Sequence, residues 1–155
     1  MPEPLEEPYY TTRWVVLLPN AQRLGKAPKC MPTSTPWWRR LGRQLVPRRT
    51  GRDCCWYHQG DWHKVNKTAI RFLHQAQRAG ISTTGWDDNI CTYVMNWARG
   101  EGITGWDLEA LTSLFIEPIQ VQRCVSEWLR DYGEGQHRSH AMIDTGVRRT
   151  VVLAE

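Results

Sequence analysis

The sequence predicts a mainly α-helical fold, namely a small bundle of about four short helices behind a basic N-terminal arm rich in Pro and Trp. Apolar residues recur with helical spacing between residues 61 and 132, whereas prolines and glycines interrupt the first fifty-odd residues. Basic side chains concentrate before the helical region. We therefore divide the chain into a poorly regular arm (1–53), a helical domain (54–133) and a C-terminal tail with a short strand (134–155).

The first predicted helix begins after Asp61, whose side chain can accept the N-terminal backbone hydrogen bonds, and runs to about Ala79. Gly80 is expected to end it in the left-handed conformation, with Ile81 as the apolar residue that follows such an ending. The apolar stripe of this helix consists of Val65, Ala69, Phe72, Leu73 and Ala76.

Three more helices follow in the prediction. One spans residues 88–99, one begins after Asp107, and one begins at Pro118, because proline suits the first helical position, and ends at Gly133. Two short apolar runs outside the bundle, at 13–18 and 149–153, predict strands. A lone pair of strands is marginally stable, so we expect the pair to brace the bundle.

A short repeat marks the joints between these helices. Gly80-Ile81 followed by Gly85-Trp86-Asp87 is matched by Gly102-Ile103 followed by Gly105-Trp106-Asp107. At both places the order is a glycine stop, an apolar anchor, a turn glycine, a Trp and an Asp that can cap the next helix. Trp86 and Trp106 therefore have two interpretations: they pack at helix joints or, together with Trp37 and Trp38, they form a surface for a protein partner.

The charge distribution is the main functional signal. Residues 11–52 contain ten of the 20 basic side chains and no Asp or Glu, although the net charge is only +4. Such a stretch repels itself and attracts phosphate polymers. Its paired arginines interleave with Trp37 and Trp38, which suits phosphate contact and base stacking and is typical of nuclear localisation signals. The residues expected to contact nucleic acid or direct nuclear import are Arg39, Arg40, Arg43, Arg48, Arg49 and Arg52. The alternative is a solvated tail without a specific partner.

The densest group of reactive side chains lies just before the helical region. Cys54, Cys55, His58 and His63 fall within ten residues, and the two histidines have an H-x4-H spacing. Three readings stay open: a structural zinc site, a packed Cys/aromatic/His cluster, or a reactive thiol with His58 as the base. No phosphate loop, G-x-S-x-G or H-E-x-x-H motif occurs, so we expect no enzymatic activity and no cofactor other than that zinc.

The amino-acid composition and the lengths of the apolar runs limit the classes of protein to which the chain can belong. No run approaches the roughly eighteen apolar residues of a membrane span, and no charged segment followed by an apolar run opens the chain, so we expect neither a membrane partner nor secretion. Five Cys without regular spacing favour reduced thiols in cytosol or nucleus. Nine Trp against two Phe is unusual, and Trp suits cores, interfaces and base stacking alike.

Several short motifs occur in the order found in a known viral family: Cys55-Trp56-Tyr57-His58, Asn66, Ile70-Arg71-Phe72, and Gly85-Trp86-Asp87 with Asn89 close behind. Residues 52–132 thereby resemble the small nonstructural nuclear phosphoprotein of bocaparvoviruses, which is a family of parvoviral accessory proteins. The second Gly105-Trp106-Asp107 is an equal candidate for the last motif. The resemblance implies a non-enzymatic viral protein in the host nucleus that supports replication and viral RNA processing by binding host RNA-processing proteins. The chain lacks that family's later C-x-x-C pair, and its leader is rich in Pro and Trp rather than in Ser/Arg.

Two other functions remain open. The second and third predicted helices could form a DNA-binding helix-turn-helix, although the connection from Arg99 to Asp107 is expected to be too long and the recognition helix is apolar. The chain could also be a protein-binding adaptor or host antagonist without nucleic-acid contact. The sequence does not distinguish RNA from DNA as the preferred ligand.

Overall fold

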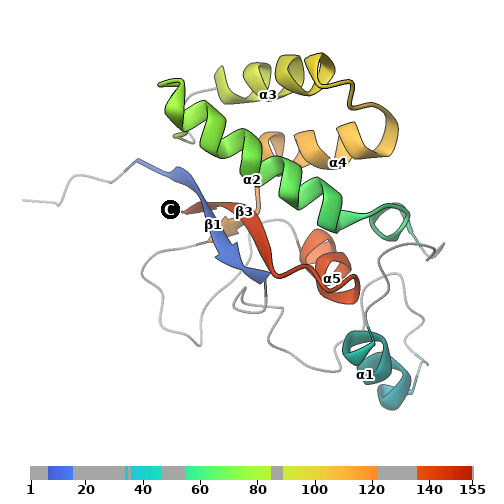
Figure 1. Ribbon diagram of the computed structural model, residues 1–155. Coiled ribbons are helices and arrows are strands. Elements are labelled where there is room, and N and C mark those ends of the chain that lie inside the picture. Colours follow the sequence, from blue (N-terminus) through green and yellow to red (C-terminus); the bar gives the residue numbers. More distant parts are fainter. Residues whose placement is uncertain are drawn as a thin grey trace, which may run out of the picture.

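The computed structural model describes residues 7–15, 34, 36–46, 55–84, 89–121 and 136–154. Within these residues the fold is mainly helical with a small three-stranded sheet, so the predicted fold class is confirmed (Figure 1). The elements are β1 (Tyr9–Trp14), α1 (Trp37–Leu45), the 3₁₀ turn η3 (Trp56–His58), α2 (Trp62–Arg78), α3 (Asn89–Gly100), α4 (Gly105–Ile116), β2 (Gln120–Val121), α5 (Gln136–Asp144) and β3 (Arg149–Ala154).

The central helix α2 forms for the reasons that the sequence predicts. Asp61 caps it, since its carboxylate accepts hydrogen bonds from the backbone N–H groups of His63 (2.9 Å) and Lys64 (3.4 Å). Gly80 ends it with φ of 73°, and the N–H of Ile81 donates to the carbonyl of Ala76 over 2.9 Å. All five residues of the predicted apolar stripe are buried.

The end of α3 repeats the end of α2, whereas α4 begins differently from the prediction. The predicted helix 88–99 is α3, which ends at Gly100. It is followed by Gly102 with φ of 73° and by a 3.0 Å hydrogen bond from the N–H of Ile103 to the carbonyl of Ala98. In α4 the prediction was wrong at the N-cap, because Thr104 occupies that position and Asp107 lies in the first turn. The Asp107 carboxylate instead reaches across to Lys64, with 2.8 Å between Oδ2 and Nζ.

The sheet has the order β1-β3-β2, and β3 is its central strand. β1 pairs antiparallel with β3 from Tyr9 opposite Ala154 to Trp14 opposite Arg149, so the predicted strand at 13–18 was placed about four residues too late. Residues 150–154 are all buried, so both faces of this central strand are covered, which fits its nearly continuous apolar run in the sequence.

The helix predicted to begin at Pro118 is wrong at residues 120–121. These residues form β2, parallel to β3, and the N–H of Leu153 donates to the carbonyl of Ile119 over 2.9 Å. The second edge of β3 offers backbone partners that a local helical pattern does not reveal, and β-branched residues such as Ile119 and Val121 suit a strand. The rest of that predicted helix lies outside the described residues.

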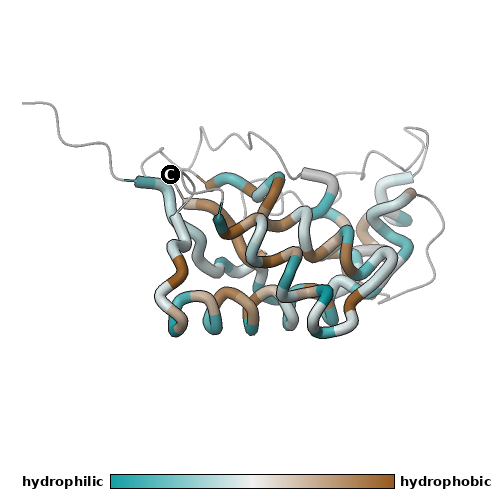
Figure 2. Tube along the Cα trace, turned by 90° about the horizontal axis from the view of Figure 1, so that it is seen from above, coloured by the Kyte–Doolittle hydropathy of each residue, from teal (hydrophilic) through white to brown (hydrophobic). Residues whose placement is uncertain are grey.

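The elements pack in layers around α2. The helix lies across the sheet, with α3 and α4 on its other side and α5 beside β3 (Figure 1). Brown and teal positions alternate along the helices in Figure 2, as expected for helices with one buried face. β1 comes from the predicted arm, and α5 and β3 come from the predicted tail, so the folded unit includes residues of all three predicted segments. Among the described residues, none of the helices is long and apolar enough to span a bilayer.

Candidate nucleic-acid interface

The described part of the basic segment is a short helix, α1, that exposes large apolar side chains beside arginine. Trp37 and Trp38 are 66% and 56% exposed, and Leu45 and Val46 are both 68% exposed. The guanidinium of Arg39 lies over the Trp38 ring, 5.2 Å from its centroid. Indole faces and a guanidinium therefore share one accessible surface.

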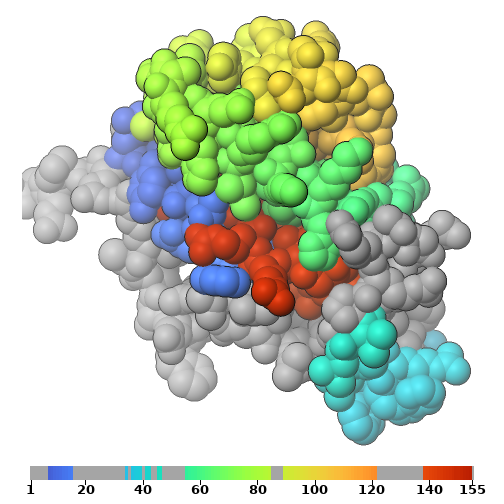
Figure 3. Space-filling view, in the orientation of Figure 1, coloured from blue at the N-terminus to red at the C-terminus, as the bar shows by residue number. Residues whose placement is uncertain are grey.

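Helix α1 has few features that would hold it in place. Pro36 precedes it and provides no side-chain cap, its first turn has no acidic residue, and nine residues is short for an autonomous helix. It contacts α5 and stands at the margin of the fold in Figures 1 and 3, where it is the cyan element. The sequence prediction of an irregular arm was wrong for this segment, because no proline falls between Pro36 and Pro47.

Of the six predicted arginines, Arg39, Arg40 and Arg43 lie on α1. Arg39 and Arg43 are four residues apart and so occupy neighbouring positions on one side of the helix. Arg48, Arg49 and Arg52 lie outside the described residues. The part of the site that the structure describes is therefore one helix with three arginines and two tryptophans.

Trp106 is turned into the fold. Its Nε1 donates to the carbonyl of Trp56 over 2.9 Å, and its ring meets that of Trp62 edge-on at a centroid distance of 5.2 Å. We call Trp56, Tyr57, Trp62 and Trp106 the inner aromatic cluster. These contacts favour the packing reading for Trp106 over a partner surface, and Trp86 lies outside the described residues.

The cysteine and histidine candidates separate into two groups of hydrogen bonds. Cys55 Sγ is 2.9 Å from His58 Nδ1, and His58 Nε2 is 2.8 Å from Asp144 Oδ2. His63 Nε2 donates instead to the backbone carbonyl of Thr145 over 2.7 Å, since a carbonyl oxygen only accepts. Cys54 is not among the described residues. Within the described part of the chain, no group of three or more His, Cys, Asp and Glu side chains is placed to hold a metal ion.

The Cys55–His58–Asp144 chain of contacts fastens η3 to α5. His58 and Asp144 are both 2% exposed, and their contact gives each a polar partner in the buried interior. Chemically, an imidazole between a thiol and a carboxylate can take the thiol proton while the carboxylate orients the ring. Sequence reasoning missed Asp144, because it lies 86 residues from His58 in a helix that was not predicted.

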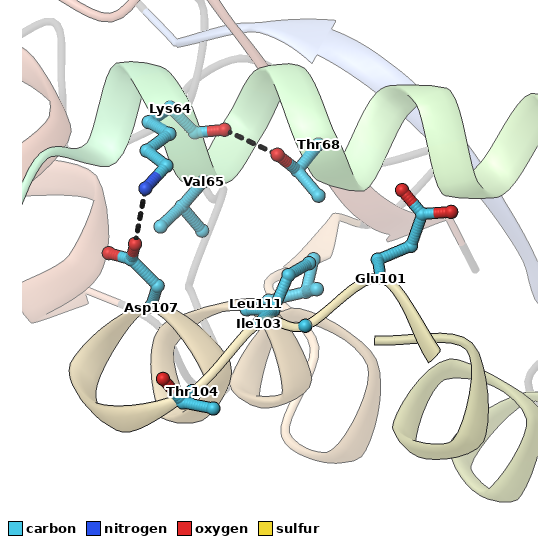
Figure 4. Close-up of a pocket in the computed structure, with 9 residues that line it drawn as sticks. Lys64, Val65, Thr68, Glu101, Ile103, Thr104, Asp107 and Leu111 are labelled. Atoms are coloured by element: carbon cyan, nitrogen blue, oxygen red, sulfur yellow. Dashed lines mark hydrogen bonds and ion pairs between the residues drawn. The ribbon is translucent and has the colours of Figure 1, made fainter. Parts of the chain in front are cut away.

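A hollow of about 280 Å³ lies between α2 and the turn that joins α3 to α4 (Figure 4). Figure 4 shows Lys64 reaching from α2 toward Asp107, and the hydrogen bond that Lys64 donates to the Asp107 carboxylate raises the pKa of Lys64 above its usual value. Glu101, at the other end, pairs with Arg71 over 3.0 Å. With two carboxylates in its wall and its amine already paired, this hollow is unsuited to a polyanion. We call it the acidic hollow.

Comparisons of the chain with models of protein families, with curated proteins and with solved structures found no match.

Proposed function

We propose that the chain is a non-enzymatic viral protein of the host nucleus that supports viral replication and RNA processing by binding nucleic acid and host RNA-processing proteins. The observation that carries the binding function is α1, which exposes Trp37 and Trp38 beside Arg39 in a segment without a single carboxylate. The viral and nuclear parts of the proposal rest on the motif resemblance and on the paired arginines.

The physical case for α1 is that its large apolar side chains are exposed rather than buried in the fold. Large exposed apolar groups that gather on one element mark interaction surfaces more often than scattered ones do. Arginine forks bind phosphate oxygens, and indole faces stack on unpaired bases. A single-stranded nucleic acid offers both groups at once.

A helix-turn-helix built from α3 and α4 is less consistent with the charges. The connection between the two helices is residues 101–104, shorter than the sequence led us to expect, and this length does fit a helix-turn-helix. The recognition helix α4, however, carries Asp107 and Glu109 and no Lys or Arg, and Leu111 and Leu114 on it are buried. Two carboxylates facing a DNA backbone would repel it.

The binding proposal is tested by measuring the affinity for single-stranded RNA and DNA as a function of salt. Each phosphate contact releases counterions, so log K should fall with log salt by about 0.7 per contact on a single strand. Changing Arg39, Arg40 and Arg43 to Gln should weaken binding and reduce that slope by about 2. The matched control changes three arginines on the other helices: Arg71, Arg78 and Arg99. A slope near zero for the wild-type chain would contradict the proposal and favour the protein-binding adaptor.

Nuclear targeting is tested separately in cells. The chain is fused to a fluorescent protein so that the fusion is too large to enter the nucleus by diffusion. A charge-reversed variant of this fusion should no longer accumulate in the nucleus. The residues changed to Glu are Arg39, Arg40, Arg43, Arg48, Arg49 and Arg52. Unchanged nuclear accumulation would remove these arginines from the targeting role.

A further inference from the structure

A second hollow, an open groove of about 340 Å³, lies between the first half of α2 and the adjoining ends of β1 and β3. Four residues of α2 line one wall of the groove, and their spacing of i, i+3, i+4 and i+7 places them on one face of the helix. They are His63, Asn66, Lys67 and Ile70. The opposite wall is made by Trp14, Val147, Arg148 and Arg149. In Figure 3 the surfaces of α2 (green), β1 (blue) and β3 (red) meet on the face turned to the reader.

The charge of this groove is the opposite of that of the acidic hollow. Lys67, Arg148 and Arg149 are all exposed, and none of the described residues that line the groove is acidic. Among the described residues, no carboxylate forms an ion pair with these three cations. A cluster of like charges at an open groove favours an anionic ligand.

Trp14 gives the groove a fixed aromatic surface. It is 46% exposed although it belongs to a strand. Arg149 lies directly opposite it in the β1·β3 ladder, with its guanidinium 5.1 Å from the centroid of the Trp14 ring. Arg149 also donates a hydrogen bond to the hydroxyl of Thr12, so the arginine is held from a second side. A base that stacks here would meet an indole whose orientation is already set.

Asn66 contributes an unsatisfied acceptor. The side chain is 2% exposed, and its Nδ2 donates to the backbone carbonyl of Trp62 over 2.8 Å. Because a carbonyl only accepts, this bond fixes which end of the amide is the oxygen. The remaining Oδ1 is buried and has no hydrogen-bond donor among the described residues. A buried acceptor left unpaired is costly, and a ligand that brings an N–H group would satisfy it.

We propose that this groove binds one nucleotide of a single-stranded nucleic acid. The base stacks against Trp14, and the Asn66 side chain shifts so that its buried Oδ1 accepts from an exocyclic amino group of the base. The phosphate lies among Lys67, Arg148 and Arg149. The volume lies within the range of known small-ligand sites. This inference rests on the proposed function, because it takes nucleic acid as the ligand. It adds a second binding site, on α2, β1 and β3 rather than on α1.

The test is fluorescence anisotropy with the full chain and labelled single-stranded oligo(A) and oligo(U). Uracil lacks an exocyclic amino group, so the wild type should prefer oligo(A) by roughly fivefold, and Asn66→Leu should erase that preference. Trp14→Ala should weaken binding by at least about fivefold, whereas Trp14→Phe keeps a stacking ring and should stay within about twofold. Arg148→Gln changes only an exposed side chain and should lower the salt slope by about 0.7.

Three results would overturn the inference. Trp14→Ala and Arg148→Gln could both bind like the wild type, the oligo(A) preference could be absent, or free AMP could bind as tightly as the oligomer, which would make the occupant a mononucleotide. The failure of the groove is distinguishable from the failure of the proposed function. If the α1 variants weaken binding and the groove variants do not, only the groove is wrong. If the wild type shows no salt-dependent binding, both are wrong.

Discussion

Two groups of the described tryptophans differ in their environment. Trp62 is fully buried, and Trp106 packs against it within the inner aromatic cluster. Trp14, Trp37 and Trp38 are instead between 46% and 66% exposed. Tryptophan, which is unusually frequent in this chain, therefore serves both in the core and on the accessible surface. The composition alone does not distinguish these two uses.

The neighbours of each group explain the difference. The Nε1 groups of Trp62 and Trp106 donate to the backbone carbonyls of Tyr57 and Trp56, so their single polar atom is satisfied inside the fold. Two of the exposed rings instead have an arginine over one face, Arg149 over Trp14 and Arg39 over Trp38. An exposed indole next to a cation suits a ligand that has both a planar ring and a negative charge.

The largest expected effect comes from removing a ring of the inner group. Trp62→Ala should lower the free energy of unfolding by about 3–5 kcal/mol, because it removes a fully buried indole and leaves a cavity. Trp37→Ala, at an exposed position, should stay within about 0.5 kcal/mol. Urea denaturation of both variants measures the difference. Equal losses in the two variants would mean that Trp37 is part of the core.

A smaller effect is expected from crowding Trp106. A Cβ at Gly60 would overlap the six-membered part of the Trp106 ring, so Gly60→Ala should cost about 1–3 kcal/mol. Gly42→Ala is the control, because a Cβ at that position of α1 has no atom of another side chain within 4 Å. We expect Gly42→Ala to leave the urea midpoint unchanged or slightly higher, since alanine favours a helix. A harmless Gly60→Ala would show that Trp106 has room to move.

The smallest effect concerns the acidic hollow. The raised pKa of Lys64 means that its pairing with Asp107 stabilises the folded chain fully below the pKa that lysine has when unfolded. That contribution should disappear as the pH rises through the raised folded value. At neutral pH the urea midpoint of the wild type should be slightly higher than that of Lys64→Met, and the difference is small because the pair is exposed to solvent. The two midpoints should therefore converge in the alkaline range. A gap that widens with pH would contradict the assignment.

The features that sequence reasoning predicted are local ones. The Asp61 cap, the glycine endings at Gly80 and Gly102 and the apolar stripe of α2 depend on residues within a few positions of each other. Trp37, Trp38 and Arg39, which are exposed on α1, were likewise visible as neighbours in the chain, although the helix that carries them was not predicted.

The missed features depend on contacts between distant segments. Asp144 meets His58 only because α5 packs against η3, and β2 forms because β3 has a second edge. The residues of the groove proposed to bind a nucleotide come from β1, α2, the turn before β3 and the first residue of β3, so no continuous motif contains them. One signal was present in the sequence, the helical spacing of His63, Asn66, Lys67 and Ile70 beside the buried stripe.

The central claim is that nucleic acid meets the exposed tryptophans and their arginines and not the carboxylate-bearing side of the bundle. Ultraviolet cross-linking of the chain to single-stranded oligo(A), followed by mass spectrometry of the linked peptides, tests it most directly. The account predicts adducts at Trp37 or Trp38 on α1 and at Trp14 in the groove. Adducts confined to α4, around Asp107 and Glu109, would contradict it.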